Sequence, residues 1–358
     1  MKKKLILLFA FAQIVLFSFS CKKEQVNTQS LYAGTETDNL SINANGDTIS
    51  LFKDIPVYGI YRYPVVQDTL PPGIVRLSNP AVAKFINITP ILKNYKKGMQ
   101  LLLTLYGQED YYDRLAYIYF SDKKPVADGP DQSIKTNSGI EAMRFITPFF
   151  SNTSNPNKKI FVSDVTDITD IIPYLNKDVW VAVQIDNNPE YRVSGKAGFT
   201  FSLDIVKTST APSSSYVQNL FKTSMYQKNY ADTFVTDKAL TNARISFTTS
   251  AHGSATGGEE YAHRKHYIYI DGVLASTIDT KKDCGPYRQF SPLGNPGIFI
   301  GNNTFNPRNW CPGEVLPHYS IYLGNLAKGQ HIIRVEVPDA DFGSAGDNII
   351  VSGYLTGN

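Results

Sequence analysis

Short segments in which apolar and polar residues alternate recur along most of the chain and restrict what it can fold into. Alternation with a period of two is typical of β-strands that bury one face, and the Val, Ile, Tyr, Phe and Thr residues of these segments favour strands. The segments are MQLLLTLYG, RLAYIYF, DVWVAVQID, AGFTFSLDIV, ARISFTTS, KHYIYIDG, PGIFIG, YSIYLG, HIIRVEV and NIIVSGYL. Helical periodicity is scarce. The sequence therefore predicts an all-β chain built of sandwiches.

A polar stretch, KTSTAPSSS at residues 207–215, interrupts the strands and predicts a linker. We expect an N-terminal sandwich over residues 31–210 and a C-terminal sandwich over residues 211–358, each long enough to enclose its own core. A cleft between two packed domains is a usual location for a ligand site.

The first 21 residues have the composition of a bacterial export signal. Lys2, Lys3 and Lys4 precede an apolar run from Leu5 to Phe19, which is followed by Ser20 and Cys21. The run is shorter than the roughly 20 residues of a membrane span. We expect residues 1–21 to be a lipoprotein signal peptide with Cys21 lipidated, and residues 22–30 to be a polar tether. Ordinary secretion with cleavage nearby is the alternative. Lipidation predicts a protein anchored in the cell envelope, at the outer membrane or cell surface.

The charge balance argues against nucleic acid as a partner. The chain has 35 Lys+Arg and 32 Asp+Glu, so loss of the three lysines of the signal leaves 32 against 32. A near-neutral surface does not neutralise phosphates.

Cys284 and Cys311 remain as an even pair if Cys21 carries lipid. An even pair in an oxidising compartment predicts a disulfide, and two buried thiols are the alternative. Their spacing lacks the C-x2-C pattern of zinc sites.

Ionisable residues crowd the stretch GGEEYAHRKHYIYIDG, residues 257–272. If it is extended, Glu260, Arg264 and His266 share the core-directed face of the following isoleucines. The stretch then either reaches a polar, half-buried cleft or forms a solvated strand end. His263 and His266 would lie on opposite faces, so we expect no metal site.

A second acidic cluster, Glu109, Asp110 and Asp113, precedes Arg114 in YGQEDYYDRLAYIYF, a loop between two predicted strands. Loops often carry catalytic groups. The alternative is a solvated loop that keeps the sheet edge soluble. The motifs G-x-S-x-G, H-E-x-x-H and G-x-G-x-x-G do not occur in the chain.

Five stretches, in this order, resemble the bacterial peptide-N-glycosidase F (PNGase F) family: YDRLAYIYF, RFITPFF, DVTDITDIIPYL, EEYAHRKHYIYI and NPRNWCPG. The resemblance implies two side-by-side jelly-roll-like antiparallel β-sandwich domains with the active site between them. It also implies hydrolysis, without metal or other cofactor, of the amide bond that joins an N-glycan to asparagine in glycoproteins or glycopeptides.

The resemblance assigns the catalytic roles to Asp113 and Glu260, and a family disulfide to Cys284 and Cys311. Supporting or substrate-binding roles fall on Arg114, Arg264, His266, Arg308 and Trp310. One family glutamate aligns with Gln184, which cannot hold a charge; Asp186, on the same strand face, could substitute for it. The alternative function is a catalytically impaired module that binds glycan or peptide in the same cleft.

Overall fold

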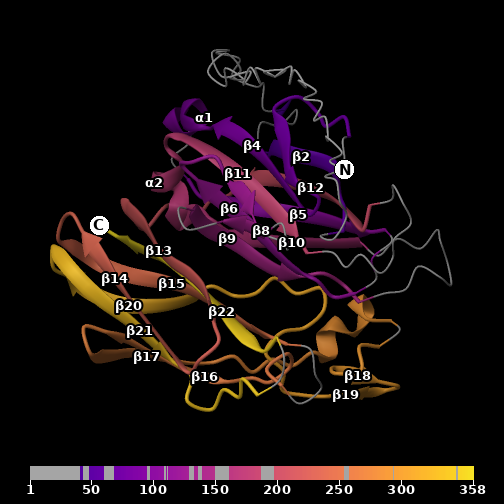
Figure 1. The fold of residues 1–358 in the computed structure, drawn as a ribbon. Coiled ribbons are helices and arrows are strands. Elements are labelled where there is room, and N and C mark those ends of the chain that lie inside the picture. Colours follow the sequence, from indigo (N-terminus) through magenta and orange to yellow (C-terminus); the bar gives the residue numbers. More distant parts are fainter. Residues whose placement is uncertain are drawn as a thin grey trace, which may run out of the picture. The chain divides into compact units, whose positions relative to one another are not determined.

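Two pairs of antiparallel β-sheets make up the part of the chain that the computed structural model describes (Figure 1). The described residues are 41–42, 48–59, 68–94, 97–108, 110, 112–128, 133–135, 139–149, 161–186, 197–253, 258–292, 294–343 and 346–358. Residues Met1–Glu36 separate from Thr37–Asn358 as a unit of their own. The predicted signal peptide, Cys21 and tether lie outside the described residues.

The first pair consists of two five-stranded sheets. One sheet contains, in spatial order, β1 (Ser41–Ile42), β2 (Thr48–Val57), β12 (Phe199–Lys207), β5 (Met99–Gly107) and β10 (Phe161–Asp167). The other contains β3 (Ile74–Ser78), β4 (Ala81–Asn87), β11 (Asp178–Ile185), β6 (Leu115–Ser121) and β9 (Gly139–Ile146). Spatial neighbours come from distant parts of the sequence, as in jelly rolls.

The second pair consists of two four-stranded sheets. One contains β13 (Tyr216–Met225), β22 (Asn348–Gly357), β15 (Leu240–His252) and β20 (Tyr319–Leu326). The other contains β14 (Asn229–Thr236), β21 (Gly329–Glu336), β16 (Lys265–Ile270) and β17 (Val273–Asp279).

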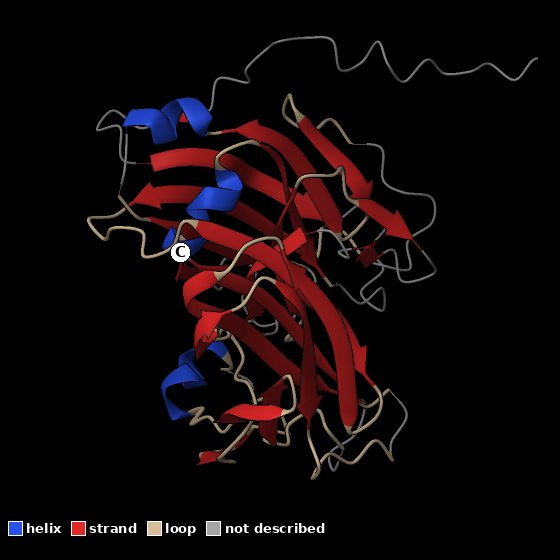
Figure 2. Ribbon diagram, turned by 90° about the vertical axis from the view of Figure 1, so that its left-hand side faces the viewer, coloured by secondary structure: helices blue, strands red, loops and turns tan. Residues whose placement is uncertain are grey.

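The remaining elements are small (Figure 2). They are the hairpins of β7 (Val126–Asp128) with β8 (Ser133–Lys135) and β18 (Phe299–Ile300) with β19 (Asn303–Thr304), the helices α1 (Thr89–Asn94) and α2 (Ile172–Leu175), and the 3-10 segments Thr169–Ile171 and Gly285–Phe290. Among the described residues, no helix has the length and apolar character needed to cross a membrane.

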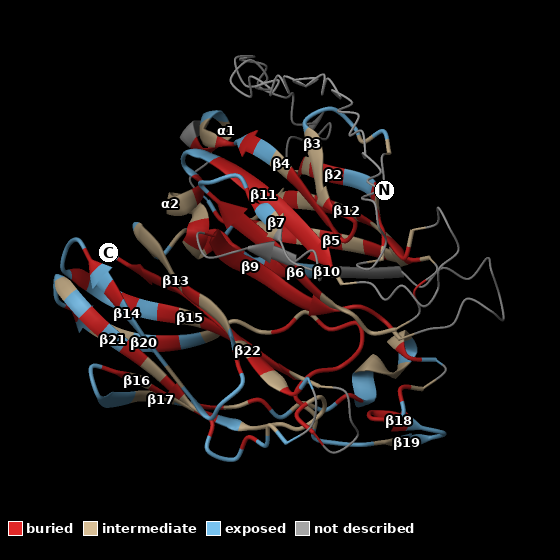
Figure 3. Cartoon of the chain, in the orientation of Figure 1, coloured by how far each residue is buried: buried red, intermediate tan, exposed pale blue. Residues whose placement is uncertain are grey.

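Each pair of sheets encloses its own apolar core. In β5 every second residue is buried, and in β16 His266, Ile268 and Ile270 are buried while Tyr267 and Tyr269 are not. Figure 3 shows the same alternation as stripes along β21. The predicted period of two thus directs one face of these strands into a core.

Strand β9 departs from this alternation, because all its residues are buried. One face lies in the first core, and the strand also contacts β13 and β22 of the second sheet pair. Arg144 donates from Nη1 to Ser250 Oγ at 3.0 Å and to the main-chain oxygen of Ile350 at 2.7 Å. Its charge is compensated by Glu141, at 2.6 Å. β9 therefore joins the two sheet pairs through the polar contacts of Arg144 as well as through its apolar residues.

The predicted fold class, all-β with two side-by-side antiparallel sandwiches, is confirmed. The division into domains at residue 210 stays a prediction, because residues Thr37–Asn358 form one compact unit.

Candidate functional site

The loop between β5 and β6 presents Asp113 in a fixed position. The buried carboxylate of Asp110 accepts two hydrogen bonds from Arg114, from Nε at 2.8 Å and from Nη2 at 3.2 Å. The main chain of Arg114 is tied to Thr147, the residue after β9: its N–H donates to Oγ1 at 2.6 Å and its carbonyl accepts from the N–H at 2.8 Å. A two-point arginine–carboxylate bond has a defined geometry, so Asp110 and Thr147 fix the position of Arg114, the residue next to Asp113.

The half-buried carboxyl group of Asp113 reaches the second half of the chain, where Oδ2 accepts a hydrogen bond from Nδ2 of Asn295. Burial raises the pKa of Asp113 to about 7, against the opposing effects of the Asn295 donor and the positive charge of Arg114. Near neutral pH this carboxyl group is therefore ionised in only part of the molecules.

Glu260 lies in the turn that precedes β16. Its Oε2 accepts from the main-chain N–H of Gly253, and its carbonyl accepts from Asn309 Nδ2 at 2.8 Å. Burial, together with the negative charges of Asp113 and Asp347, raises the pKa of Glu260 to about 8 against the opposing effect of the Gly253 donor. The two acids, one from each sheet pair, thus lie within electrostatic range of each other.

Tyr261 lies within electrostatic range of the two acids, and Arg308 lies within electrostatic range of Tyr261. The Tyr261 side chain is hydrogen-bonded to Asn295, and its burial, together with the negative charges of Asp113 and Glu260, raises its pKa. Its ring lies over Gly297, where a Cβ atom would be 2.1 Å from the ring. Arg308 donates from Nε to the carbonyl of Gly297 at 2.8 Å. Only glycine permits this approach of ring to backbone.

Trp310, for which the resemblance implies a supporting or substrate-binding role, lies below the surface of the site. It is 1% exposed, and its Nε1 donates to the carbonyl of Ala251 at 2.9 Å. Its ring packs against Tyr261 with centroids 5.4 Å apart. Trp310 therefore supports Tyr261 from within a small apolar cluster.

Arg264 and His266 differ from the expectation that they support Glu260. Arg264 pairs with the fully buried Glu259, at 2.7 Å between Nη2 and Oε1. His266 bonds to Thr249 Oγ1 at 3.0 Å, and its burial lowers its pKa to about 4. The cause is the turn at residues 258–261, because β16 begins only at Lys265 and the alternation does not extend back to Glu260.

Gln184 and Asp186 share a face, as predicted, since Gln184 Nε2 donates to Asp186 Oδ1 at 2.7 Å. The main-chain N–H of Asp186 donates to the carbonyl of Leu115 at 3.0 Å. This bond places Asp186 beside the chain two residues after Asp113.

The predicted disulfide between Cys284 and Cys311 is confirmed, with Cα atoms 5.4 Å apart. It closes the segment that carries Asn295, Gly297 and Arg308. The cystine is buried and packs in the same cluster as Trp310.

The histidines near Glu260 serve separate contacts. His263 pairs with Asp279 at 3.0 Å on the surface, while His266 is buried in the sandwich. Within the described residues, no three His, Cys, Asp or Glu side chains are arranged to hold a metal ion.

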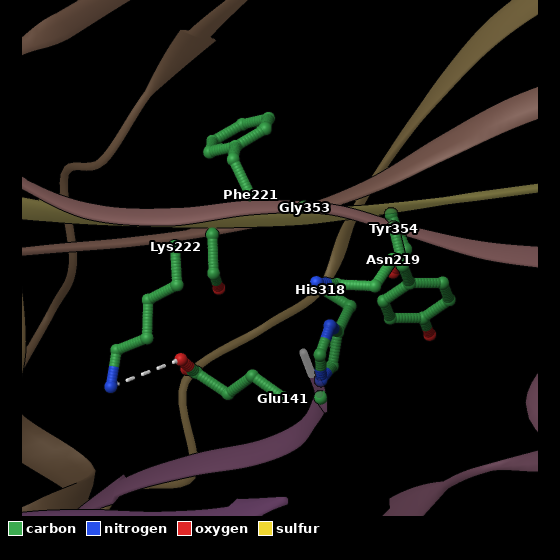
Figure 4. A pocket seen from close by; sticks show the side chains of 10 residues that line it. Glu141, Asn219, Phe221, Lys222, His318, Gly353 and Tyr354 are labelled. Atoms are coloured by element: carbon green, nitrogen blue, oxygen red, sulfur yellow. Dashed lines mark ion pairs between the residues drawn. The ribbon is translucent and has the colours of Figure 1, made fainter. Parts of the chain in front are cut away.

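A second polar cluster lies between β9 and β13 (Figure 4). Lys222 Nζ is 3.8 Å from Glu141 Oε2, contacts the Tyr119 hydroxyl and lies 3.4 Å from the Tyr117 ring centroid. The space among these side chains admits no water-sized sphere, so the cluster is a contact between sheet pairs and not a ligand site.

The family model described as peptide-N-glycosidase F, C terminal, matches residues 220–356. Residues 220–356 are therefore similar to the C-terminal part of the peptide-N-glycosidase F family. The predicted resemblance is therefore confirmed. The matched residues include Glu260, Asn295 and Arg308 of the site. No curated protein sequence matches the chain significantly.

Solved structures of family members share the fold. A structure of PNGF-II has a TM-score of 0.70 at 24% identity, covering 87% of this chain and 65% of that chain. PNGase F, described as a glycosylasparaginase from Flavobacterium meningosepticum, has a TM-score of 0.58 at 17% identity, covering 87% and 95%. The chain thus spans slightly less than two thirds of PNGF-II.

Sequence reasoning missed three residues at the site: Asn295, Tyr261 and Gly297. Asn295 lies in SPLGN, where Gly and Pro predict a turn, and Gly297 lies in the predicted strand PGIFIG; neither pattern indicates a role in the site. The sequence shows Tyr261 as the aromatic residue beside Glu260. Its contact with Asn295 depends on the fold of the segment between β17 and β20, which the local sequence pattern does not predict.

Proposed function

We propose that the protein is an amidase that hydrolyses the amide bond between asparagine and N-acetylglucosamine in N-glycoproteins or glycopeptides. The observation that carries the proposal is the meeting of Asp113 and Glu260, each with a pKa raised by burial, to about 7 and about 8. A family structure described as peptide-N(4)-(N-acetyl-β-D-glucosaminyl) asparagine amidase supports this substrate class.

The pKa values suit the two acids to different steps. Near pH 7.5 the pair holds roughly one proton, and the group of lower pKa, Asp113, is the one that releases its proton first. Ionised Asp113 then accepts a proton from the water that attacks the amide carbonyl carbon. Protonated Glu260 donates to the nitrogen as the C–N bond breaks. The products are aspartate in the polypeptide and a glycosylamine.

Two arginines offer donors for the oxygen that becomes negative during the attack. In the described part of the chain, Arg114 uses Nε and Nη2 for Asp110, and its Nη1 has no hydrogen-bond partner. Among the described residues, Arg308 uses Nε for Gly297 and Nη1 for Pro307, and no partner of Nη2 is found there. Donors directed at developing charge in a site shielded from water lower the barrier.

Digestion of a denatured N-glycoprotein in oxygen-18 water tests the proposal. The expected result is release of the whole glycan and aspartate carrying oxygen-18 at the glycosylation site, with no release by Asp113→Ala. Retention of one N-acetylglucosamine on asparagine would mean glycosidic cleavage instead. Measurable glycan binding without any release would identify a binding module.

We also propose that the protein is exported and anchored through a lipid on Cys21. The buried disulfide supports an oxidising compartment. Cys21→Ser should lose incorporation of labelled fatty acid and move from the membrane fraction to the soluble fraction. Membrane retention of that variant would contradict the anchor.

A further inference from the structure

The side-chain amide of Asn295 is fixed at both ends. Its Oδ1 accepts a hydrogen bond from the main-chain N–H of Gly297 at 2.8 Å, and its Nδ2 donates to Oδ2 of Asp113. The residue is 2% exposed. A main-chain N–H can only donate, so the oxygen of the amide must face Gly297 and its NH₂ group must face Asp113.

The backbone around Asn295 is anchored as firmly as the side chain. The carbonyl of Asn295 accepts from the N–H groups of Ile298 at 2.9 Å and Phe299 at 2.6 Å, and both of these side chains are buried. Arg308 Nε holds the carbonyl of Gly297, and the disulfide closes the whole segment. The donor is therefore positioned before any substrate binds.

We propose that Asn295 is a positioning residue that holds Asp113 by Oδ2 and leaves Oδ1 as the oxygen that takes the proton from water. The catalytic consequence of this inference rests on the proposed function. The hydrogen bond between Asn295 and Asp113 does not depend on that function. An NH₂ donor stabilises an ionised carboxylate more than a protonated one. Asn295 thus opposes the effect of burial and keeps Asp113 available as a base.

Other titratable and charged groups also act on Asp113. Arg114 favours the ionised form, whereas Asp110 disfavours it. Glu260 and Tyr261 also lie within electrostatic range. Arg114, Asp110 and Glu260 are the same in wild type and variant, whereas Tyr261 loses its hydrogen bond to Asn295. The titration of Asp113 is therefore also compared with that in Tyr261→Phe, which removes the Tyr261 hydroxyl group and keeps Asn295.

Asn295→Ala tests the proposal, with the exposed Asn302→Ala as the matched control. Carbon-13 NMR of aspartate carboxyl groups, assigned by difference from Asp113→Asn, follows the pKa of Asp113 without substrate. Loss of a hydrogen bond to a charged group should raise this pKa by about one to two units. The acidic limb of kcat/KM should move up by the same amount, with kcat partly recovered at higher pH, and Asn302→Ala should match wild type in both.

Should Asn295→Ala fail to fold, Asn295→Asp keeps the bond to Gly297 and the side-chain shape. Two carboxyl groups in contact cannot both ionise easily, so the pair should retain a proton above the pH at which wild-type Asp113 releases it. An unchanged titration of Asp113 in a folded variant overturns the proposal. A shifted titration in a protein without amidase activity would refute the proposed function while leaving the positioning role intact.

Discussion

Arg264 forms its ion pair with Glu259, at 2.7 Å, and not with the neighbouring Glu260. Glu259 is fully buried and also accepts from the N–H of Asp341 at 2.6 Å. Glu260 instead accepts from the N–H of Gly253 and lies near Asp113. Two adjacent glutamates therefore have separate tasks, one in the fold and one in the site.

Substitution of each glutamate should separate these tasks. Glu259→Gln leaves Arg264 without its charge partner, and we expect the free energy of unfolding to fall by about 3 kcal/mol. Glu260→Gln should keep the wild-type stability or exceed it but lower kcat at least about 100-fold. Chemical denaturation and glycopeptide kinetics measure the two effects. The assignment is wrong if Glu259→Gln is the variant with normal stability and impaired chemistry.

The strands could be predicted because they depend on local pattern, and the order of the motifs singled out Asp113 and Glu260 as candidates. The alternation that predicted MQLLLTLYG as a strand is the burial pattern of β5. The partners of Glu260 could not be predicted, because a turn of a few residues reverses which side chains point inward. The role of Asn295 could not be predicted either, because its partner Asp113 is 182 residues away in the sequence and such a contact leaves no local sequence pattern.

Activity should follow a bell-shaped pH profile. Below pH about 7 Asp113 gains a proton and cannot accept one from water, and above pH about 8 Glu260 loses the proton that it donates. We expect kcat/KM to be highest between these values when measured from pH 5 to pH 10. A constant kcat/KM from pH 6 to pH 9 would remove both groups from the proposed steps.

The stability of the folded chain should depend on pH through Asp113. Its pKa is raised from 3.8 to about 7, so between these values the unfolded chain binds fewer protons than the folded one. The free energy of unfolding therefore falls as pH rises through this range. Asp113→Asn removes this loss of stability. The variant should therefore raise Tm by roughly 2–6 °C at pH 8, and by less at pH 5. The surface change Asp122→Asn serves as control; an equal Tm difference at both pH values would contradict the linkage.

Loss of the disulfide should weaken stability and activity together, because it closes the segment that holds Asn295 and Arg308. The bond spans 27 residues, and closing a loop of this size stabilises by roughly 3–4 kcal/mol in the chain-entropy model. The double variant Cys284→Ser, Cys311→Ser should therefore show a lower Tm and a lower kcat/KM at 25 °C. Wild-type kinetics in a destabilised double variant would mean that the site does not depend on this closure.

Gln184→Glu tests whether the missing charge at position 184 limits the enzyme. Gln184 is 3% exposed and its NH₂ group donates to Asp186, so the variant brings two carboxyl groups into contact. Their repulsion should lower Tm at pH 8 more than at pH 5, and we expect kcat not to rise. Asp186→Asn should lower kcat/KM by about tenfold, the effect of one lost hydrogen bond. If Gln184→Glu raises kcat while Asp186→Asn leaves kcat/KM unchanged, the charge belongs at position 184 and Asp186 does not substitute for it.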